Sequence, residues 1–260
     1  MKIVTIASGS SGNCVYIGSE KRNILIDAGI PMRRIEAGLA EAGLSANDLD
    51  AVFITHEHSD HISGLGSLMR KYELPAYMTE GTHRAITEKK LIGKVEEDFF
   101  RIISPEFSYS LGDLDVECFS VSHDAAQPVM YKISDGSSTA AVVTDLGEYD
   151  RGIVERLTGL DAVLLETNHD IRMLQTGPYP YYLKQRIMGS RGHLSNEAAA
   201  ELLGEIYSER LKKVILGHIS KTNNYEELAY ETIRVESKFI GCGADISVAP
   251  RDRASGVIEF

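Results

Sequence analysis

The stretch Ala51–His61, with the sequence AVFITHEHSDH, decides how the chain is interpreted. It starts as an apolar run typical of a strand and ends in His56, His58, Asp60 and His61. Neutral imidazole and carboxylate are ligands that Zn²⁺, Fe and Mn²⁺ accept. Alternating residues at a strand end can direct His56 and His58 to one cation and the two later ligands to a second. The pattern therefore predicts a two-metal site, and a solvated charged loop is the weaker alternative.

Two metal ions need more donors than one loop supplies, and ionisable residues follow three other apolar runs. They are His123, Asp145 and His218. Each of them alone would more often be an ordinary loop residue than a ligand. Together with the first cluster they fit a dinuclear site, in which Asp145 bridges the cations and a shared water loses its proton near neutral pH. The expected nucleophile is a hydroxide that bridges the metals.

Strand-like runs and helical patterns alternate along the chain. Apolar spacings of three and four predict helices over 35–42, 62–69 and 199–206, and Ser195 is expected to cap the third. No Pro-, Ser- or charge-rich linker interrupts them, so residues 1–260 are interpreted as one domain. The α/β pattern fits two sheets packed face to face with helices outside, or a single doubly wound sheet. Strands are expected over 2–7, 15–18, 23–27, 51–55, 114–121, 130–134, 140–144, 162–166, 213–217 and 256–260.

Composition excludes several classes of protein. Of 260 residues, 43% are apolar, which is enough for a substantial core, yet no apolar run approaches the roughly 18–20 residues of a membrane-spanning helix. We therefore expect no membrane association. The three cysteines lack CxxC spacing, so neither a disulfide framework nor a cysteine zinc site is indicated, and a cytoplasmic location is expected. Metal identity and oligomeric state are left open by the sequence.

The order of the motifs resembles that of metallo-β-lactamase-fold hydrolases, and most closely the YycJ (WalJ/VicX) group. The resemblance extends from about Ala7 to Asn224. The motifs that carry it are ASGSSGN at 7–13, LIDAG at 25–29, THEHSDHI at 55–62, SHDAA at 122–126, ETNHD at 166–170, GHLSN at 192–196 and HIS at 218–220.

This resemblance implies a fold, an activity and a set of roles. The fold would be a four-layer αββα sandwich, α/β in class. The activity would be hydrolysis of nucleic-acid phosphodiesters by a 5′→3′ DNA exonuclease, related to ribonuclease Z and ribonuclease J. The family pattern gives His56, His58 and His123 to the first metal, Asp60, His61 and His218 to the second, and Asp145 to both. His193 would protonate the leaving oxygen with Glu166 as its partner, and Asp60 would also act in catalysis.

Charge bears on the substrate. Lys and Arg number 27 against 38 Asp and Glu, giving a net charge of −11, which is unusual for a nucleic-acid enzyme. The segment 171–192, however, has four cations, no acid and three tyrosines, so it fits phosphates and unpaired bases. The alternative is a helix with its tyrosines in the core, and a small-molecule hydrolase is the alternative function. The candidate substrate contacts are Arg186, Arg191, Ser195, Lys221 and Asn223.

Overall fold

The computed structural model describes residues 1–260, and the chain folds into two compact units. The first comprises residues 1–120, 125–137 and 250–259, and the second comprises 121–124 and 138–249 together with Phe260. The chain thus first enters the second unit for four residues, and His123 is one of them. That residues 1–260 form a single domain stays a prediction.

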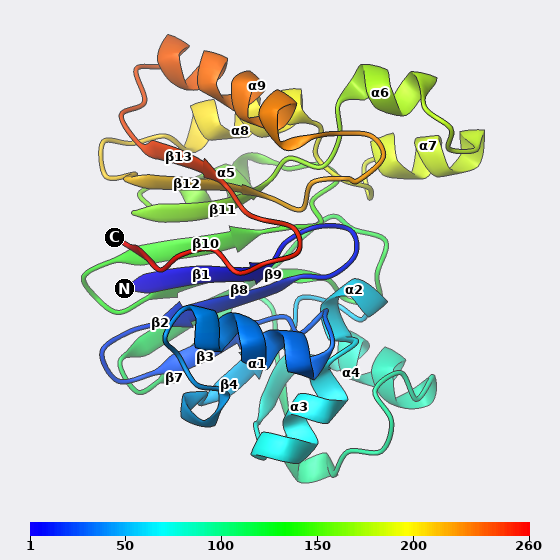
Figure 1. Ribbon diagram of the computed structural model, residues 1–260, viewed down its shortest axis with the longest axis vertical. Coiled ribbons are helices and arrows are strands. Elements are labelled where there is room, and N and C mark those ends of the chain that lie inside the picture. Colours follow the sequence, from blue (N-terminus) through cyan, green and yellow to red (C-terminus); the bar gives the residue numbers. More distant parts are fainter. The chain divides into compact units, whose positions relative to one another are not determined.

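The first unit is built on a seven-stranded sheet with the order β14-β1-β2-β3-β4-β5-β6 (Figure 1). Its strands pair antiparallel from β14 to β3 and parallel from β3 to β6. A further antiparallel ladder, β7-β8-β9, belongs to this unit. The strand bounds are β1 Lys2–Ala7, β2 Cys14–Gly18, β3 Asn23–Ile26, β4 Ala51–Phe53, β5 Ala76–Thr79, β6 Phe100–Ile103, β7 Phe107–Leu111, β8 Leu114–Ser120, β9 Val129–Ser134 and β14 Ile258–Glu259.

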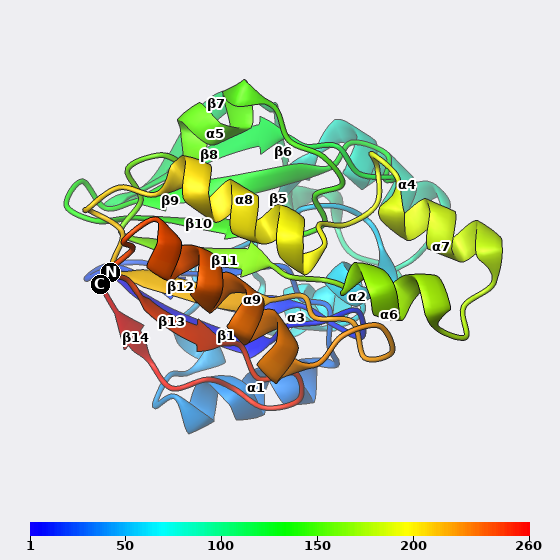
Figure 2. The same cartoon turned by 90° about the horizontal axis from the view of Figure 1, so that it is seen from above.

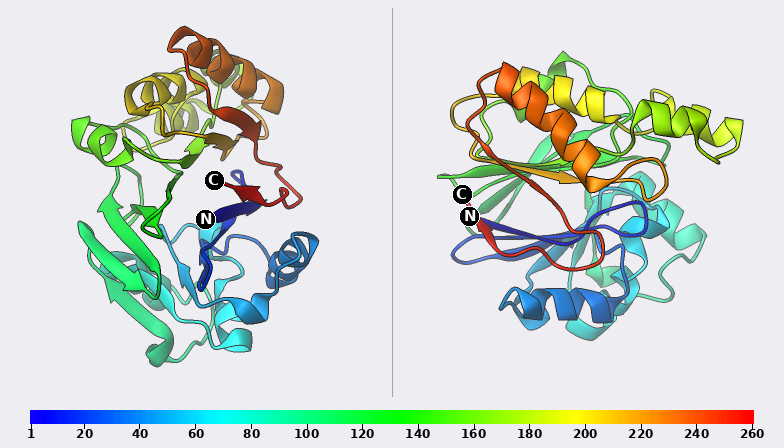
Figure 3. Two further views of the ribbon diagram at one scale, coloured as in Figure 1. Left: turned by 90° about the vertical axis from the view of Figure 1, so that its left-hand side faces the viewer. Right: turned by 45° about the horizontal axis from the view of Figure 1, so that its top comes forward.

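Helices of the first unit bury the apolar stripe that their spacing predicts. In α1, Ile35 and Leu39 lie one turn apart and are fully buried. Each such side chain contributes roughly 1.5–3 kcal/mol of burial free energy. β14 pairs with β1, so the two ends of the chain lie side by side (Figure 3). The helices are α1 Met32–Glu41, α2 Ser59–Ile62, α3 Leu65–Tyr72 and α4 Glu80–Glu88, with 3₁₀ turns at η1 Ala46–Asp48 and η2 Glu97–Phe99.

The second unit contains four parallel strands in the order β13-β12-β11-β10. Val143 pairs with Leu165 and Leu165 with Leu216, so the carboxyl ends of β10, β11 and β12 lie at one edge. Helices α8 and α9 pack together over this sheet (Figure 2). The bounds are β10 Thr139–Val143, β11 Ala162–Glu166, β12 Lys213–Gly217, β13 Asp245–Val248, α5 Arg151–Leu157, α6 Ile171–Thr176, α7 Tyr181–Met188, α8 Asn196–Ile206 and α9 Glu226–Phe239.

The elements agree with the sequence predictions in most places, with two kinds of error. Each of the ten predicted strands overlaps an observed strand, and Ser195 caps α8 by accepting a hydrogen bond from the Ala198 amide at 3.1 Å. The single helix predicted over 62–69 is wrong, because α2 ends at Ile62 and α3 begins at Leu65. Between them, the Gly64 amide donates to the Ala28 carbonyl oxygen at 2.8 Å. Strands β5, β6, β7 and β13 were not predicted. No helix has the length and apolar character needed to cross a bilayer.

Candidate active site

The predicted ligands of the first unit follow β4 and lead into α2. The imidazole ring centroids of His56 and His58 are 4.6 Å apart, and those of His56 and His61 are 4.1 Å apart. The Nε2 atom of His61 lies 3.6 Å from a carboxylate oxygen of Asp60 and 3.1 Å from the Asn13 side-chain amide. A six-residue segment, made of a short loop and the start of α2, therefore brings three imidazoles and a carboxylate together, as the sequence spacing predicts.

The Asp27 carboxylate fixes this segment through contacts with Thr55 and His61. Its Oδ2 atom is 2.7 Å from Nδ1 of His61 and accepts a hydrogen bond from the Thr55 hydroxyl at 2.9 Å, while Oδ1 accepts from the Thr55 amide at 2.8 Å. The Thr55 hydroxyl is also 3.0 Å from Nδ1 of His56. A carboxylate on one imidazole nitrogen fixes the ring and leaves the other nitrogen to act as a ligand. Asp27 is thus a positioning residue.

Sequence reasoning missed Thr55, Asn13 and Gly29 as parts of this support. Thr55 contacts three functional side chains, and its position directly before His56 was the available signal. The Asn13 and Gly29 amides join the surrounding turns through backbone hydrogen bonds to Asp60 at 2.8 Å and to Asn13 at 2.7 Å. These long-range contacts leave no local pattern in the sequence.

Gly29 lies so close to the ligand loop that a larger residue cannot fit. A Cβ atom at this position would lie 1.7 Å from the carbonyl oxygen of Asp60. We expect Gly29→Ala to displace the loop and to lower the free energy of unfolding by about 1–3 kcal/mol, with loss of bound metal. Chemical denaturation and elemental analysis measure both effects. Gly256→Ala is the matched control, because no atom lies within 4 Å of its added Cβ, and an equal loss in both variants would contradict the argument.

In the second unit, the parallel sheet gathers Asp145, Glu166 and His218 at its carboxyl edge. They follow or end β10, β11 and β12. Nδ1 of His218 lies 3.4 Å from Oδ2 of Asp145 and 3.1 Å from Oε1 of Glu166. Asp145 and His218 have φ angles of 56° and 52°, in the left-handed region that few residues other than glycine, Asn and Asp adopt readily. Such backbone strain concentrates at functional sites.

His193 contacts the same cluster. Its Nδ1 atom is 2.8 Å from Oε1 of Glu166 and 3.5 Å from Oδ1 of Asp145. Glu166 is fully buried, and its Oε2 accepts a hydrogen bond from the Leu146 amide at 2.9 Å. Burial alone would lower the pKa of His193, but the Glu166 carboxylate outweighs burial and raises it. In turn, burial would raise the pKa of Glu166, but His193 and His218 hold it below its usual value. The pair favours an imidazolium beside a carboxylate.

His123 lies on the short segment Val121–Asp124 and is held by the chain around Gly192. Its Nδ1 atom is 3.1 Å from the Gly192 carbonyl oxygen, and its Nε2 atom is 3.6 Å from Oδ1 of Asp145. Burial lowers the pKa of His123, which favours the neutral imidazole that binds metals. The guanidinium of Arg191 donates to the His123 carbonyl oxygen at 3.2 and 3.0 Å.

The predicted substrate contacts lie in different surroundings. The Arg186 guanidinium pairs with Asp124, and Lys221 is exposed. Ser195 is buried with its hydroxyl engaged as the cap of α8, and Asn223 is fully buried. Contact of these residues with a substrate stays a prediction. The alternative that places the tyrosines of segment 171–192 in the core is wrong, because Tyr181 and Tyr182 are 77% and 74% exposed and Tyr179 is only half-buried.

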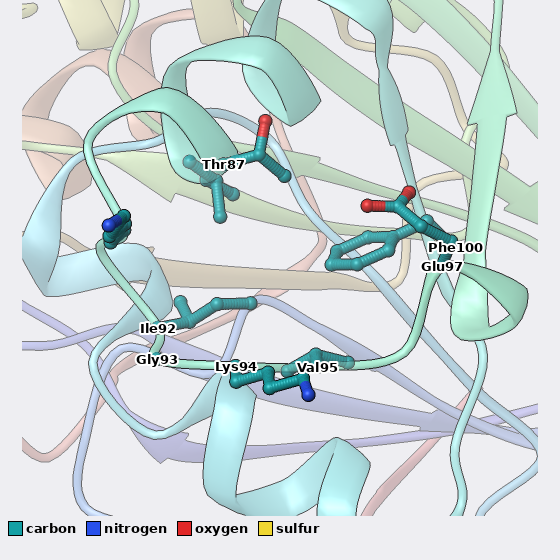
Figure 4. Close-up of a pocket in the computed structure, with 9 residues that line it drawn as sticks. Thr87, Ile92, Gly93, Lys94, Val95, Glu97 and Phe100 are labelled. Atoms are coloured by element: carbon teal, nitrogen blue, oxygen red, sulfur yellow. The ribbon is translucent and has the colours of Figure 1, made fainter.

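A separate hollow of about 410 Å³ lies on the first unit beside α4 (Figure 4). Its lining includes Ile92, Val95 and Phe100, with Lys94 and Glu97 at its edge. None of the predicted site residues lines it. We therefore place the candidate chemistry at two donor sets and not in this hollow. The first donor set is His56, His58, Asp60 and His61 of the first unit, and the second is His123, Asp145, Glu166, His193 and His218 of the second unit.

The donor chemistry fits divalent metal binding. In the second unit, ligand atoms of Asp145, Glu166, His193 and His218 lie within 4.8 Å of one another. In the first, one ring nitrogen of His61 is held by a carboxylate, an arrangement that is common for metal-binding histidines. Imidazole and carboxylate donors without thiolate suit Zn, Mn and Fe equally. Divalent metal binding follows from this chemistry.

Comparison with known proteins gives the family. A model described as "Beta-lactamase superfamily domain" matches residues 22–219. "Exodeoxyribonuclease WalJ" of Streptococcus pneumoniae (strain ATCC BAA-255 / R6) is 41% identical over 249 residues, covering 95% of this chain and 93% of the relative. The chain belongs to the WalJ and YycJ group of the beta-lactamase superfamily. "Exodeoxyribonuclease YycJ" of Bacillus anthracis, another member of this group, is 39% identical and covers 95% of the chain and 94% of the relative.

A solved structure has the same fold as this chain. The metallo-beta-lactamase fold protein YhfI of Bacillus subtilis has a TM-score of 0.71 at 18% identity and covers 98% of each chain. The predicted metallo-β-lactamase fold, α/β in class, is therefore confirmed, and the alternative of a single doubly wound sheet is wrong. The chain is a hydrolase of this fold.

Proposed function

We propose that this chain is an exodeoxyribonuclease that removes nucleotides from a DNA end in the 5′→3′ direction. The observation that carries the proposal is the 41% identity, over 95% of the chain, to a protein named as an exodeoxyribonuclease. The His193–Glu166 contact supports it, because breaking a phosphodiester leaves an alkoxide oxygen that needs a proton. DNA is the proposed substrate in preference to RNA.

Two divalent metal ions, Zn, Mn or Fe, are part of the proposal. When bound, such ions would polarise a phosphate oxygen and lower the pKa of a water molecule toward neutrality. The proposed ligands belong to strand ends and loops in both units. They are His56, His58 and His123 for the first ion, Asp60, His61 and His218 for the second, and Asp145 for both.

The remaining roles belong to side chains that move or hold protons. Glu166 contacts Nδ1 of His193, so it fixes the ring and leaves Nε2 as the atom that donates a proton to the leaving oxygen. Asp60 orients the attacking water through its carboxylate. We retain Lys221, Arg186, Arg191, Ser195 and Asn223 as proposed contacts to the substrate.

A labelled DNA duplex tests the activity directly. With Mn²⁺ added, a 5′→3′ exonuclease releases a 5′ label at once as a short product, whereas a 3′-labelled strand shortens into a ladder. The reverse pattern would contradict the direction, and internal cuts would indicate an endonuclease. If small esters are hydrolysed and both DNA and RNA duplexes stay intact, the chain is a small-molecule hydrolase instead.

We also propose a cytoplasmic location, based on cysteine usage. Cys14 and Cys118 are buried free thiols, and Cys242 is a partly buried one. Burial raises the pKa of Cys118 to about 12, which makes this thiol inert at neutral pH. Cell fractionation followed by detection of the protein tests the location.

A further inference from the structure

The residues Ile171–Gly192, which we name the helical arm, contain α6 and α7 and are unlike the rest of the second unit. Figure 2 shows both helices extending beyond the ends of β10, β11 and β12. No residue of α7 is buried, and its two tyrosines, Tyr181 and Tyr182, are about three-quarters exposed. Helices in proteins are stabilised mainly by packing of an apolar face. When a helix exposes aromatic rings to water and does not pack them against the core, the exposed rings indicate a binding surface.

The arm is positively charged in an acidic protein. It contains Arg172, Lys184, Arg186 and Arg191 and no Asp or Glu, so its charge is +4, whereas the rest of the chain carries −15. The acidic remainder repels a polyanion, and the arm attracts one. Among anionic macromolecules, nucleic acid offers both phosphates and flat rings. The pairing of exposed tyrosines with cations matches the composition of sites that bind single strands.

The arm also offers a hollow beside the ring of Tyr181. It has a volume of about 260 Å³ and is lined by Tyr181, Lys184, Gln185, Met188 and Gln175. This volume is below the roughly 300–1,000 Å³ typical of sites for drug-sized ligands, so it suits a group of the size of one nucleobase. The two glutamine amides offer hydrogen bonds to a base edge, and the sulfur of Met188 packs readily on a flat ring.

Hydrogen bonds hold the arm in a fixed shape. The Lys184 ammonium donates to the carbonyl oxygens of Gln175 at 2.8 Å and Gly177 at 2.7 Å, which ties α7 to the end of α6. Asp170 caps α6 by accepting from the Met173 amide at 2.7 Å. A rigid platform loses little entropy when a strand binds to it.

The far end of the arm joins the proposed proton donor. The His193 amide donates to the carbonyl oxygen of Ile187 in α7 at 3.0 Å. Tyr182 is five residues before Ile187, about 7.5 Å along the helix axis. Arg186 pairs with Asp124, and Arg191 binds the His123 carbonyl, so the arm is also attached to the segment that carries His123. A strand lying on α7 therefore lies within a few nucleotides of His193.

We propose that the helical arm binds the single-stranded segment of DNA next to the end being cleaved, with bases stacked on Tyr181 and Tyr182. This inference rests on the proposed function and adds a substrate class to it, namely ends that carry an unpaired strand. Bases inside a duplex cannot stack on the rings, because neighbouring base pairs cover both of their faces. The cation of Arg172 contacts the phosphates of the bound strand.

The test compares two double variants in the metal-loaded protein. We expect Tyr181→Ala/Tyr182→Ala to weaken binding of a fluorescent oligodeoxythymidylate with phosphorothioate linkages about 5- to 100-fold, measured by fluorescence anisotropy. Tyr181→Phe/Tyr182→Phe keeps the rings and should bind like the parent protein. Phe239→Ala removes another exposed ring, at the end of α9 and outside the arm, and should change nothing. With hydrolysable single strands, the loss should appear as a raised KM.

The outcomes separate this inference from the proposed function. If the parent protein degrades DNA but the double alanine variant binds the oligonucleotide equally well, the arm is not the strand site, and a protein partner becomes its better occupant. If the phenylalanine variant is as weak as the alanine variant, hydroxyl groups and not stacking carry the binding, which also overturns the proposal. If the parent protein degrades no DNA at all, the proposed function itself fails. Neither tyrosine is buried, so thermal unfolding of the variants should match that of the parent.

Discussion

Replacing His193 with alanine should reduce DNA turnover by roughly 10²- to 10⁴-fold, the range of general acid catalysis, while bound metal stays at the level of the parent protein. His193 contacts Glu166 at 2.8 Å and is a proton donor in the proposal, not one of its seven ligands. The leaving oxygen would then depart without a proton. Single-turnover rates and elemental analysis of the same preparation give the two quantities.

The control for this variant is His83→Ala. His83 is in α4 of the first unit, where its ring packs on Phe100 at a centroid distance of 4.7 Å, outside both donor sets. Its replacement should leave turnover unchanged. If His193→Ala turns over DNA at the parent rate, the acid is another group. If it loses metal as well as activity, His193 is a ligand, and the proposed division of roles is wrong.

Replacing Asp145 with asparagine should remove metal and with it nearly all activity, by on the order of 10³-fold or more, since bound metal ions would supply both the nucleophile and charge stabilisation. Asn is the most conservative replacement, because it keeps the size of the side chain and tolerates the φ of 56° at this position. The variant should therefore fold normally while it lacks the carboxylate that lies 3.6 Å from His123 and 3.4 Å from His218.

Asp245→Asn is the matched control for this variant. Asp245 is an exposed carboxylate at the start of β13, paired with Lys213 in the neighbouring strand. Its loss should leave metal content and activity intact. Incubation of the parent protein with a chelator, followed by return of Zn²⁺ or Mn²⁺, should reproduce the Asp145→Asn defect and then reverse it. Full activity of Asp145→Asn would contradict the role of this residue as a shared ligand.

Local patterns in the sequence were sufficient to locate most strands and the donors. Residues 162–166 and 213–217 contain the uninterrupted apolar runs Ala162–Leu165 and Val214–Leu216, as expected of strands buried on both faces of a parallel sheet, and both strands were predicted with their observed bounds. The metal-ligand cluster from His56 to His61 was predicted from the spacing of its residues alone. The role of Ser195 as a helix cap could also be predicted from the sequence, since the cap and its amide partner are three residues apart.

Features that depend on distant contacts could not be predicted in this way. Gly64 stands between α2 and α3, and glycine is needed there because a Cβ would lie 2.1 Å from the Ile30 carbonyl oxygen, a contact across 34 residues of chain. Asp27 orients His61 across the same separation. Strand β5, with the sequence AYMT, has one β-branched residue and forms because β4 and β6 flank it. In each case the partner in space, not the neighbour in sequence, determines the structure.

The left-handed backbone at Asp27, Asp145 and His218 limits which amino acids these positions accept. Valine, isoleucine and threonine are excluded there by their branched Cβ atoms, and only Gly, Asn, Asp and a few others remain at low cost. Attempts to redesign the protein toward a softer cation by introducing sulfur ligands would thus begin with an energetic penalty at two of the seven donors. Selection experiments that vary metal preference should find their solutions at the other five positions, where the conformation of the main chain permits a wider choice.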